Sequence, residues 1–316
     1  MNLFVGNTDF DWYSYHVRRT DVEEVNFWRP MGNAGFSTLK EGELFFFKLK
    51  KAHQGKIVGF GQFLMFQKMR VLDAWDTFGF NNGVSSQREM MHRIDYYMRK
   101  NGGGSASLHH EIGCIIVTNP VFFPKEYWVD APENWKDQIV TGKTYAIQDS
   151  VGRRIYNDSL AMAELLRMPL VDDLFGSTTI LDEGDRYGEP MLTRPRLGQG
   201  GFRLKIKSIY GKCAVSGEHS TPVLEAAHIK PYAQEGSHDI QNGILLRSDI
   251  HKLYDRGYVT VDPDYTFRVS SRLKDEFNNG KTYYELENRK IWLPGDPEYW
   301  PSRENLEYHQ QVLFRG

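Results

Sequence analysis

Short apolar runs separated by turn-forming segments recur over the first 147 residues, and this pattern predicts mostly β-structure. Two apolar runs rich in aromatic residues, 43–49 and 56–66, flank a turn-forming segment that contains glycine, which predicts a β-hairpin. Residues 111–117 form a third apolar run, short enough for a buried strand. We therefore expect the first part of the chain to be a small β domain.

Two helices are predicted between residues 86 and 168. Over residues 86–100, Ser86 and Glu89 form a capping box, and apolar side chains recur every three or four positions. A second helix is expected near residues 159–168, where leucines gather. We assign this second helix to a linker over residues 148–194, so the second domain begins at residue 195.

Residues 213–263 predict a strand, a loop, a second strand and a helix. His228 lies at the end of the first strand, and the second strand is the apolar run 244–246. We expect Ser248 to cap the helix and Gly257 to end it. His251 and Asp255 are one helical turn apart and therefore point to the same side of the helix.

This order of residues favours hydrolysis of a phosphodiester. A neutral histidine such as His228 is a natural base near pH 7, because its ordinary pKa is about 6.5. His251 and Asp255 provide two ligands for one divalent cation, Mg²⁺ or Mn²⁺, which would stabilise the charge on the phosphate. Asn242, in the loop between the strands, is placed to orient the base by a hydrogen bond. The other histidines, His238 among them, show no partner in the sequence.

The net charge of −2, from 39 Lys and Arg against 41 Asp and Glu, excludes a uniformly basic DNA-binding protein. Between Met191 and Gly217, however, there is no acidic residue and there are six basic ones. Such a segment is often only a solvated surface, but beside a nuclease site it favours contacts with the DNA backbone. The candidates for these contacts are Arg194, Arg196, Arg203 and Lys205.

The two cysteines, Cys114 and Cys213, are too few and too far apart for a disulfide framework, so we expect a cytoplasmic protein. We find no membrane span and no signal peptide in the sequence, and expect no membrane partner. Ser216 stands where a Cys-x-x-Cys pair would place the partner of Cys213. We therefore expect no structural zinc.

Residues 195–316 resemble an HNH nuclease of the ββα-metal class, in which His228, Asn242 and His251 look like the three signature residues. The segments 198–203, 213–217 and 224–229 are similar to restriction-type members of that family. The resemblance implies that His228 is the general base, that Asn242 orients it, and that His251 and Asp255 hold the metal. Many relatives carry an acidic residue or histidine where this chain has Ala227, which leaves Glu225 as a reserve ligand.

Aromatic residues in the first domain lie next to proline and glycine in three turns, and such turns can wall a flat, apolar slot for a flipped nucleobase. For any one ring, filling the domain core is an equally good interpretation. The pocket candidates are Trp28, Pro30, Trp75 and Phe123, with Tyr127 and Phe78 in reserve.

Residues 40–49 and 57–61 are similar to the core of EVE domains in the PUA superfamily. That resemblance implies an α+β protein, with a closed PUA/EVE-like β-barrel that senses modified bases over residues 1–147 and a nuclease domain over 195–316. The combination resembles modification-dependent (type IV) restriction endonucleases. It implies double-stranded DNA with 5-methyl- or 5-hydroxymethylcytosine as the partner.

One HNH site cuts one strand, so double-strand cleavage requires a homodimer or two independent nicks. Two other functions stay open at this point. One is an HNH nickase or repair nuclease whose first domain reads nucleic-acid structure or RNA. The other is a reader of modified DNA that does not cleave.

Overall fold

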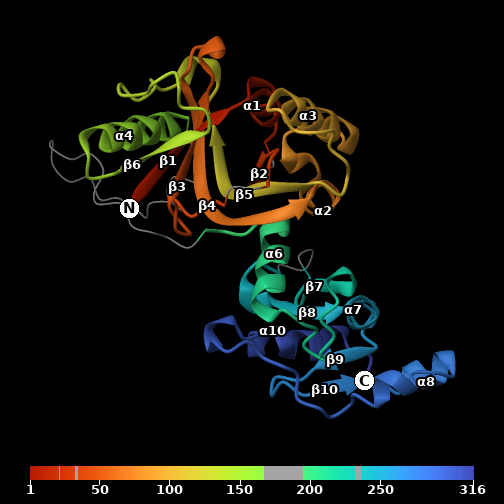
Figure 1. Ribbon diagram of the computed structural model, residues 1–316. Coiled ribbons are helices and arrows are strands. Elements are labelled where there is room, and N and C mark those ends of the chain that lie inside the picture. The colour runs from red at the N-terminus through yellow and green to blue at the C-terminus, as the bar shows by residue number, and fades with distance from the viewer. Residues whose placement is uncertain (21, 33–34, 167–194, 232–235) are drawn as a thin grey trace, which may run out of the picture. The chain divides into compact units, whose positions relative to one another are not determined.

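The computed structural model describes residues 1–20, 22–32, 35–166, 195–231 and 236–316. The chain divides into two compact units, Met1–Arg196 and Leu197–Gly316, which run from red to green and from green to blue in Figure 1. Among the helices of these residues, none is both long and apolar enough to cross a membrane.

Unit 1 is built on one six-stranded sheet with the strand order β2-β5-β4-β3-β1-β6. β1 and β3 are parallel, and all other neighbours are antiparallel. The predicted hairpin is confirmed as the antiparallel pair β3 and β4. The strands are β1 (Asn2–Thr8), β2 (Glu24–Arg29), β3 (Leu44–Leu49), β4 (Ile57–Arg70), β5 (Glu111–Phe122) and β6 (Gly142–Ala146).

The sheet is strongly curved. β2 and β3 are three strand spacings apart in the hydrogen-bonded order, which is about 14 Å in a flat sheet. Yet the ring centroids of Phe27 on β2 and Phe45 on β3 are 4.8 Å apart. The register of β4 against β5 shifts at two places, between Phe60 and Gln62 and between Phe63 and Met65, and such irregularities bend a strand. Within the described residues no ladder joins the edge strands β2 and β6, so the predicted closed barrel is not confirmed.

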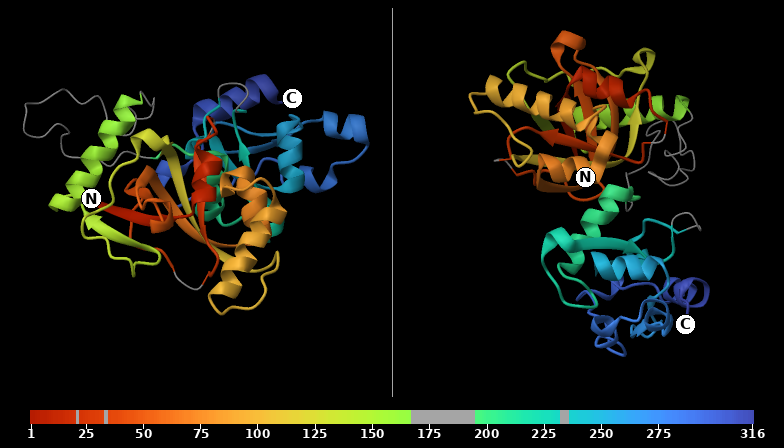
Figure 2. Two further views of the ribbon diagram at one scale, coloured as in Figure 1. Left: turned by 90° about the horizontal axis from the view of Figure 1, so that it is seen from above. Right: turned by 90° about the vertical axis from the view of Figure 1, so that its right-hand side faces the viewer.

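Both faces of this sheet are buried. Helix α4 (Ser150–Leu165) covers one face with Ile155, Tyr156 and Leu160, and Figure 2 shows it in yellow-green beside the sheet. The helix begins well before the predicted residue 159 and packs on unit 1, whereas the sequence places it in a linker. Helix α1 (Phe10–His16) contributes Trp12 and Tyr13 to the core on the other face.

Two more helices complete unit 1. Helix α3 (Gln87–Lys100) confirms the predicted helix, and the Ser86 side chain accepts a hydrogen bond from the backbone N–H of Glu89 at 3.2 Å. Helix α2 (Val71–Phe78) follows β4 directly. Helices α1 and α2 were not predicted, because each has only two turns and too few positions to establish a helical period.

Unit 2 contains the predicted strand, strand and helix: β7 (Leu224–His228) pairs antiparallel with β8 (Gly243–Arg247), and α7 (Ser248–Asp255) follows. Gly257 has a φ of +73°, which confirms it as the residue that ends α7. The prediction that Ser248 caps α7 is wrong, because the cap position is Arg247 and no side chain makes the capping hydrogen bond.

The remaining elements of unit 2 surround this motif. Helix α6 (Gln199–Tyr210) packs against β7 and β8, and was not predicted. A small hairpin of two strands follows α7, and short helices complete the unit. These elements are β9 (Val259–Val261), β10 (Phe267–Val269), α8 (Arg272–Phe277), α9 (Lys281–Tyr284) and α10 (Arg303–Tyr308).

Candidate nuclease site

His228 is the last residue of β7 and pairs with Gly243, the first residue of β8. Its ring is stacked on Phe202 of α6, with 4.1 Å between the centroids and 11° between the planes. Gly243 makes this possible, because a Cβ there would lie 2.4 Å from Ile206 and 2.8 Å from Phe202. The absence of a side chain at residue 243 therefore lets α6 approach the strands closely and support the imidazole.

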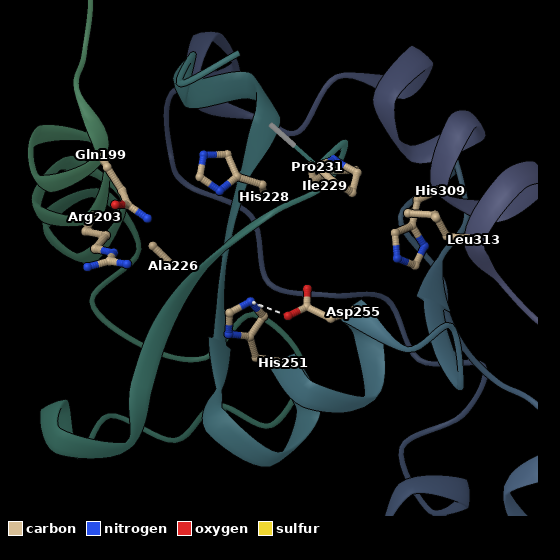
Figure 3. A pocket seen from close by; sticks show the side chains of 10 residues that line it. All are labelled: Gln199, Arg203, Ala226, His228, Ile229, Pro231, His251, Asp255, His309 and Leu313. Carbon is tan, nitrogen blue, oxygen red and sulfur yellow. Dashed lines mark ion pairs between the residues drawn. The ribbon is translucent and has the colours of Figure 1, made fainter. Parts of the chain in front are cut away.

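Helix α7 contributes the second half of the site. His251 Nε2 lies 3.4 Å from Asp255 Oδ2, the pair joined by a dashed line in Figure 3. The other ring nitrogen, Nδ1, lies 2.7 Å from Glu225 Oε2. Glu225 therefore contacts the opposite edge of the His251 ring from Asp255, and holds the ring in place from that edge.

His228, His251 and Asp255 line one cavity of about 430 Å³, together with Arg203 of α6. Figure 3 shows the rings of His228 and His251 on either side of the same space, with Asp255 beside His251. The structure thus brings the histidine of the strand and the His–Asp pair of the helix together, as a site with one base and one cation requires.

Asn242 is buried and makes all of its side-chain hydrogen bonds to the main chain. Its Oδ1 accepts from Lys230 N at 2.9 Å, and its Nδ2 donates to Lys230 O at 2.9 Å and to Ser237 O at 2.8 Å. The sequence predicted a direct hydrogen bond from Asn242 to the base. Instead, Asn242 fixes the backbone of the loop that follows His228.

His238 is a site residue that the sequence did not reveal. Its Nδ1 lies 2.9 Å from His228 Nε2. Its only signal in the sequence is its position in the loop between the two strands, shortly before Asn242. A lone histidine in a loop is common, so this signal could not have identified it.

The two histidines that face each other across the cavity differ in their pKa. The pKa of His228 is lowered to about 4, chiefly by burial and also by the neighbouring His238, Arg203 and His251, against a smaller opposing effect of Asp255. Burial also acts to lower the pKa of His251, but hydrogen bonds with Asp255 and Glu225 outweigh it and raise that pKa. At neutral pH, His228 is therefore neutral and able to accept a proton.

Of the four residues predicted to contact the DNA backbone, Arg203 lines the cavity. Lys205, two residues further along α6, does not line it. Arg196 is exposed ahead of α6, and Arg194 lies outside the described residues. Arg203 is thus the basic side chain of this group that shares a cavity with His228.

The residues of the cavity fit a divalent cation with few protein ligands. Within the described part of the chain, no group of three or more His, Cys, Asp or Glu side chains converges on one point. The donors are His251 Nε2 and the Asp255 carboxylate, a number that suits an ion that keeps several of its waters. A carboxylate on the far nitrogen of a ligating histidine is a frequent feature of metal sites, and Glu225 occupies that position.

Unit 1 contains a second cavity, of about 520 Å³, which includes two of the predicted pocket residues, Trp28 and Pro30. The Trp28 indole is held in place because its Nε1 donates to Asn82 O at 2.9 Å. The half-buried Arg29 also lines this cavity, and its guanidinium lies 5.1 Å from the Phe36 ring centre. Burial lowers the pKa of Arg29, and within the described residues it forms no ion pair.

The other pocket candidates lie elsewhere. Phe123 is fully buried in the core beneath α4 and cannot be a pocket wall, which corrects that prediction. Trp75 lies on α2, packs edge-on against Phe80 and does not line the cavity. Of the two reserves, Phe78 is buried and Tyr127 packs against the core beneath α4.

Two antiparallel strands and a helix that enclose a cavity between their histidines form a ββα arrangement. Residues 213–262 match the family model described as HNH endonuclease, so unit 2 contains an HNH endonuclease domain at these residues. No curated protein matches the chain.

Two solved structures show limited similarity to the chain. A mutant ZmASCH protein from Zymomonas mobilis is 9% identical with a TM-score of 0.32, over 49% of this chain and 96% of that one. The modification-dependent TagI restriction endonuclease is 9% identical with a TM-score of 0.28, over 93% of this chain and 77% of that one.

Proposed function

We propose that the protein is a metal-dependent DNA endonuclease that hydrolyses phosphodiester bonds at the cavity of unit 2. The observation that carries this proposal is that His228, His251 and Asp255 line one cavity within a domain that matches HNH endonucleases. A neutral base on one side and two ligand side chains on the other are the minimum that one-cation hydrolysis requires.

In this reaction His228 accepts a proton from a water molecule, and the water oxygen forms a bond to phosphorus. The bond between phosphorus and the 3′-oxygen breaks, and the departing oxygen takes a proton from solvent. Arg203 binds a phosphate oxygen and holds the strand against the base. His251 and Asp255 would hold a Mg²⁺ or Mn²⁺ ion, which supplies positive charge opposite the phosphate and the departing oxygen.

Unit 1 would select the DNA by binding an extruded, modified cytosine in its own cavity. Trp28, fixed by its hydrogen bond to Asn82, offers a rigid face on which a base can stack, for about 1–3 kcal/mol. The Arg29 guanidinium offers hydrogen-bond donors to the acceptor edge of a base. A buried methyl group adds about 0.8 kcal/mol, so the preference for 5-methylcytosine should be a few-fold. Cleavage of both strands would require two copies of the chain or two separate nicks.

The test is cleavage of supercoiled plasmid by the full chain with Mg²⁺, with Mn²⁺ and with EDTA. Matched plasmids should carry plain cytosine, 5-methylcytosine or 5-hydroxymethylcytosine. We expect metal-dependent nicking that is faster on the modified plasmids and absent for His228→Ala. Binding of the modified plasmid without nicking would favour a reader of modified DNA, and equal nicking of all three would favour a nuclease that does not sense modification.

A further inference from the structure

We propose that His238 fixes the position of the proton on His228: it accepts a hydrogen bond from His228 Nε2–H and so leaves Nδ1 as the basic atom. This inference rests on the proposed nuclease function, and it assigns His238 as a positioning residue for the base. His238 does not itself line the cavity, and it acts through His228.

The hydrogen bond determines which edge of the His228 ring faces the cavity. Stacking on Phe202 fixes the plane of the ring, and the pairing of His228 with Gly243 fixes its backbone. A half-turn of the ring about its Cβ–Cγ bond would leave both features intact and exchange a nitrogen for a carbon at each edge. The contact of 2.9 Å between His228 Nε2 and His238 Nδ1 selects one of these two orientations.

In the selected orientation, Nδ1 is the nitrogen that remains for the reaction. Figure 3 shows one nitrogen of His228 turned toward His251 and the other turned away. The nitrogen nearer His251 is bonded to the ring carbon that carries Cβ (Figure 3) and is therefore Nδ1, whereas the other, Nε2, bonds to His238. It therefore faces the side of the cavity where the His251 and Asp255 donors lie.

The direction of the hydrogen bond decides whether His228 can be a base. Two neutral imidazoles share one proton between Nε2 and Nδ1. If His238 donated it, His228 would carry its own proton on Nδ1 and could not accept one from water. If His238 accepts it, the lone pair of His228 Nδ1 is free.

His238 also stabilises the product of the proton transfer. Once Nδ1 takes a proton, His228 is an imidazolium, and its Nε2–H donates a charge-assisted hydrogen bond to His238. A carboxylate in the place of His238 would, by its negative charge, also raise the basicity of the His228 ring before the proton transfer. The neutral imidazole of His238 does not do this. The other charged or titratable groups that face His228 are Arg203, His251 and Asp255.

The proposal is tested by locating the proton directly in the metal-free protein. Selective ¹⁵N-histidine labelling and long-range ¹H–¹⁵N correlation spectra of the full chain at pH 7 distinguish the two tautomers of His228. Three variants accompany the wild type. His238→Phe keeps the ring and removes the acceptor, His238→Asn keeps an oxygen near the position of Nδ1, and His219→Phe alters an exposed histidine of the same unit.

We expect the Nε2–H tautomer of His228 in the wild type, in His238→Asn and in the His219→Phe control, and a mixture of tautomers in His238→Phe. Nicking by His238→Phe should fall on the order of 10- to 100-fold in kcat, as for other residues that orient a site histidine, with KM unchanged. His238→Asn should recover most of the rate.

An Nδ1–H tautomer in the wild type would overturn the proposal, and so would a wild-type rate in His238→Phe. If His238→Phe does not fold, the tautomers of the wild type and of His238→Asn still decide the outcome. The spectra need neither metal nor DNA. Failure of the wild type to cleave would therefore refute the nuclease function, whereas the tautomer alone tests His238.

Discussion

We expect unit 1 to lose stability as the pH falls below the ordinary pKa of histidine, because it buries His16 in a place where the ring cannot take a proton. The side chain is fully buried and stacks on Phe122, with 5.3 Å between the ring centroids. Neither ring nitrogen has a hydrogen-bond partner among the described residues. Burial, with a smaller contribution from the charge of Arg19, lowers the pKa of His16 from 6.5 to about 3.

The sign of the effect follows from proton binding. Between pH 6.5 and pH 3 the unfolded chain binds a proton on His16 that the folded unit does not, so stability falls as the pH falls. One pH unit is worth about 1.4 kcal/mol, so the free energy of unfolding should decrease by about 3 kcal/mol between pH 7 and pH 4. Above pH 6.5 both states are neutral at this residue, and its contribution is constant.

The measurement is urea denaturation at several pH values between pH 7 and pH 4, with tryptophan fluorescence as the readout of unfolding. Trp12 reports on this part of the core, because its ring centroid is 4.4 Å from that of His16. Wild type, His16→Phe and a control, His92→Phe on the exposed side of α3, should be compared. We expect wild type and control to lose about 3 kcal/mol more than His16→Phe. The same pH dependence in wild type and His16→Phe would refute the reasoning.

Four further outcomes are expected. His228→Ala should abolish nicking and leave DNA binding intact in a gel-shift assay, and residual cutting would exclude it as the base. Asp255→Ala should raise the metal concentration for half-maximal nicking by more than tenfold, and an unchanged requirement would place the ligand elsewhere. Glu225→Ala should weaken metal binding, measured by calorimetry, on the order of 10- to 100-fold. An affinity equal to that of the wild type would show that Glu225 does not orient His251. Trp28→Ala should remove the preference for methylated plasmid, whereas Trp75→Ala should keep it; equal effects would exclude the cavity of unit 1 as the sensor.

Local patterns were enough to predict the two strands and the helix that carry His228, His251 and Asp255. The strand–strand–helix order and the end of α7 at Gly257 follow from short-range signals. Helix α6 was missed because residues 203–207 alternate between polar and apolar, as in a strand. Leu204 and Ile206 are nevertheless both buried, because this helix packs on more than one side. Periodicity cannot reveal such a case.

The sequence did not identify His238, or the contact of Glu225 with His251, because these pairs meet only through the folding of the loops between them. His238 meets His228 over a separation of 10 residues, and Glu225 meets His251 over 26. Neither of these separations along the sequence is set by the period of a strand or a helix. In unit 1, the aromatic residues could not be sorted into pocket and core because both faces of the sheet are covered, and aromatic rings such as Phe123 fill the space beneath its helices.

The contact at Gly243 also has a consequence for how the nuclease could be tuned. A methyl group added there would push Phe202 outward, and with it the surface on which the His228 imidazole rests. Residue 243 thus acts as a spacer between β8 and α6 that sets the position of the His228 ring. A substitution there is expected to slow hydrolysis by moving the ring of His228, and because α6 also carries Arg203, DNA binding should change with it.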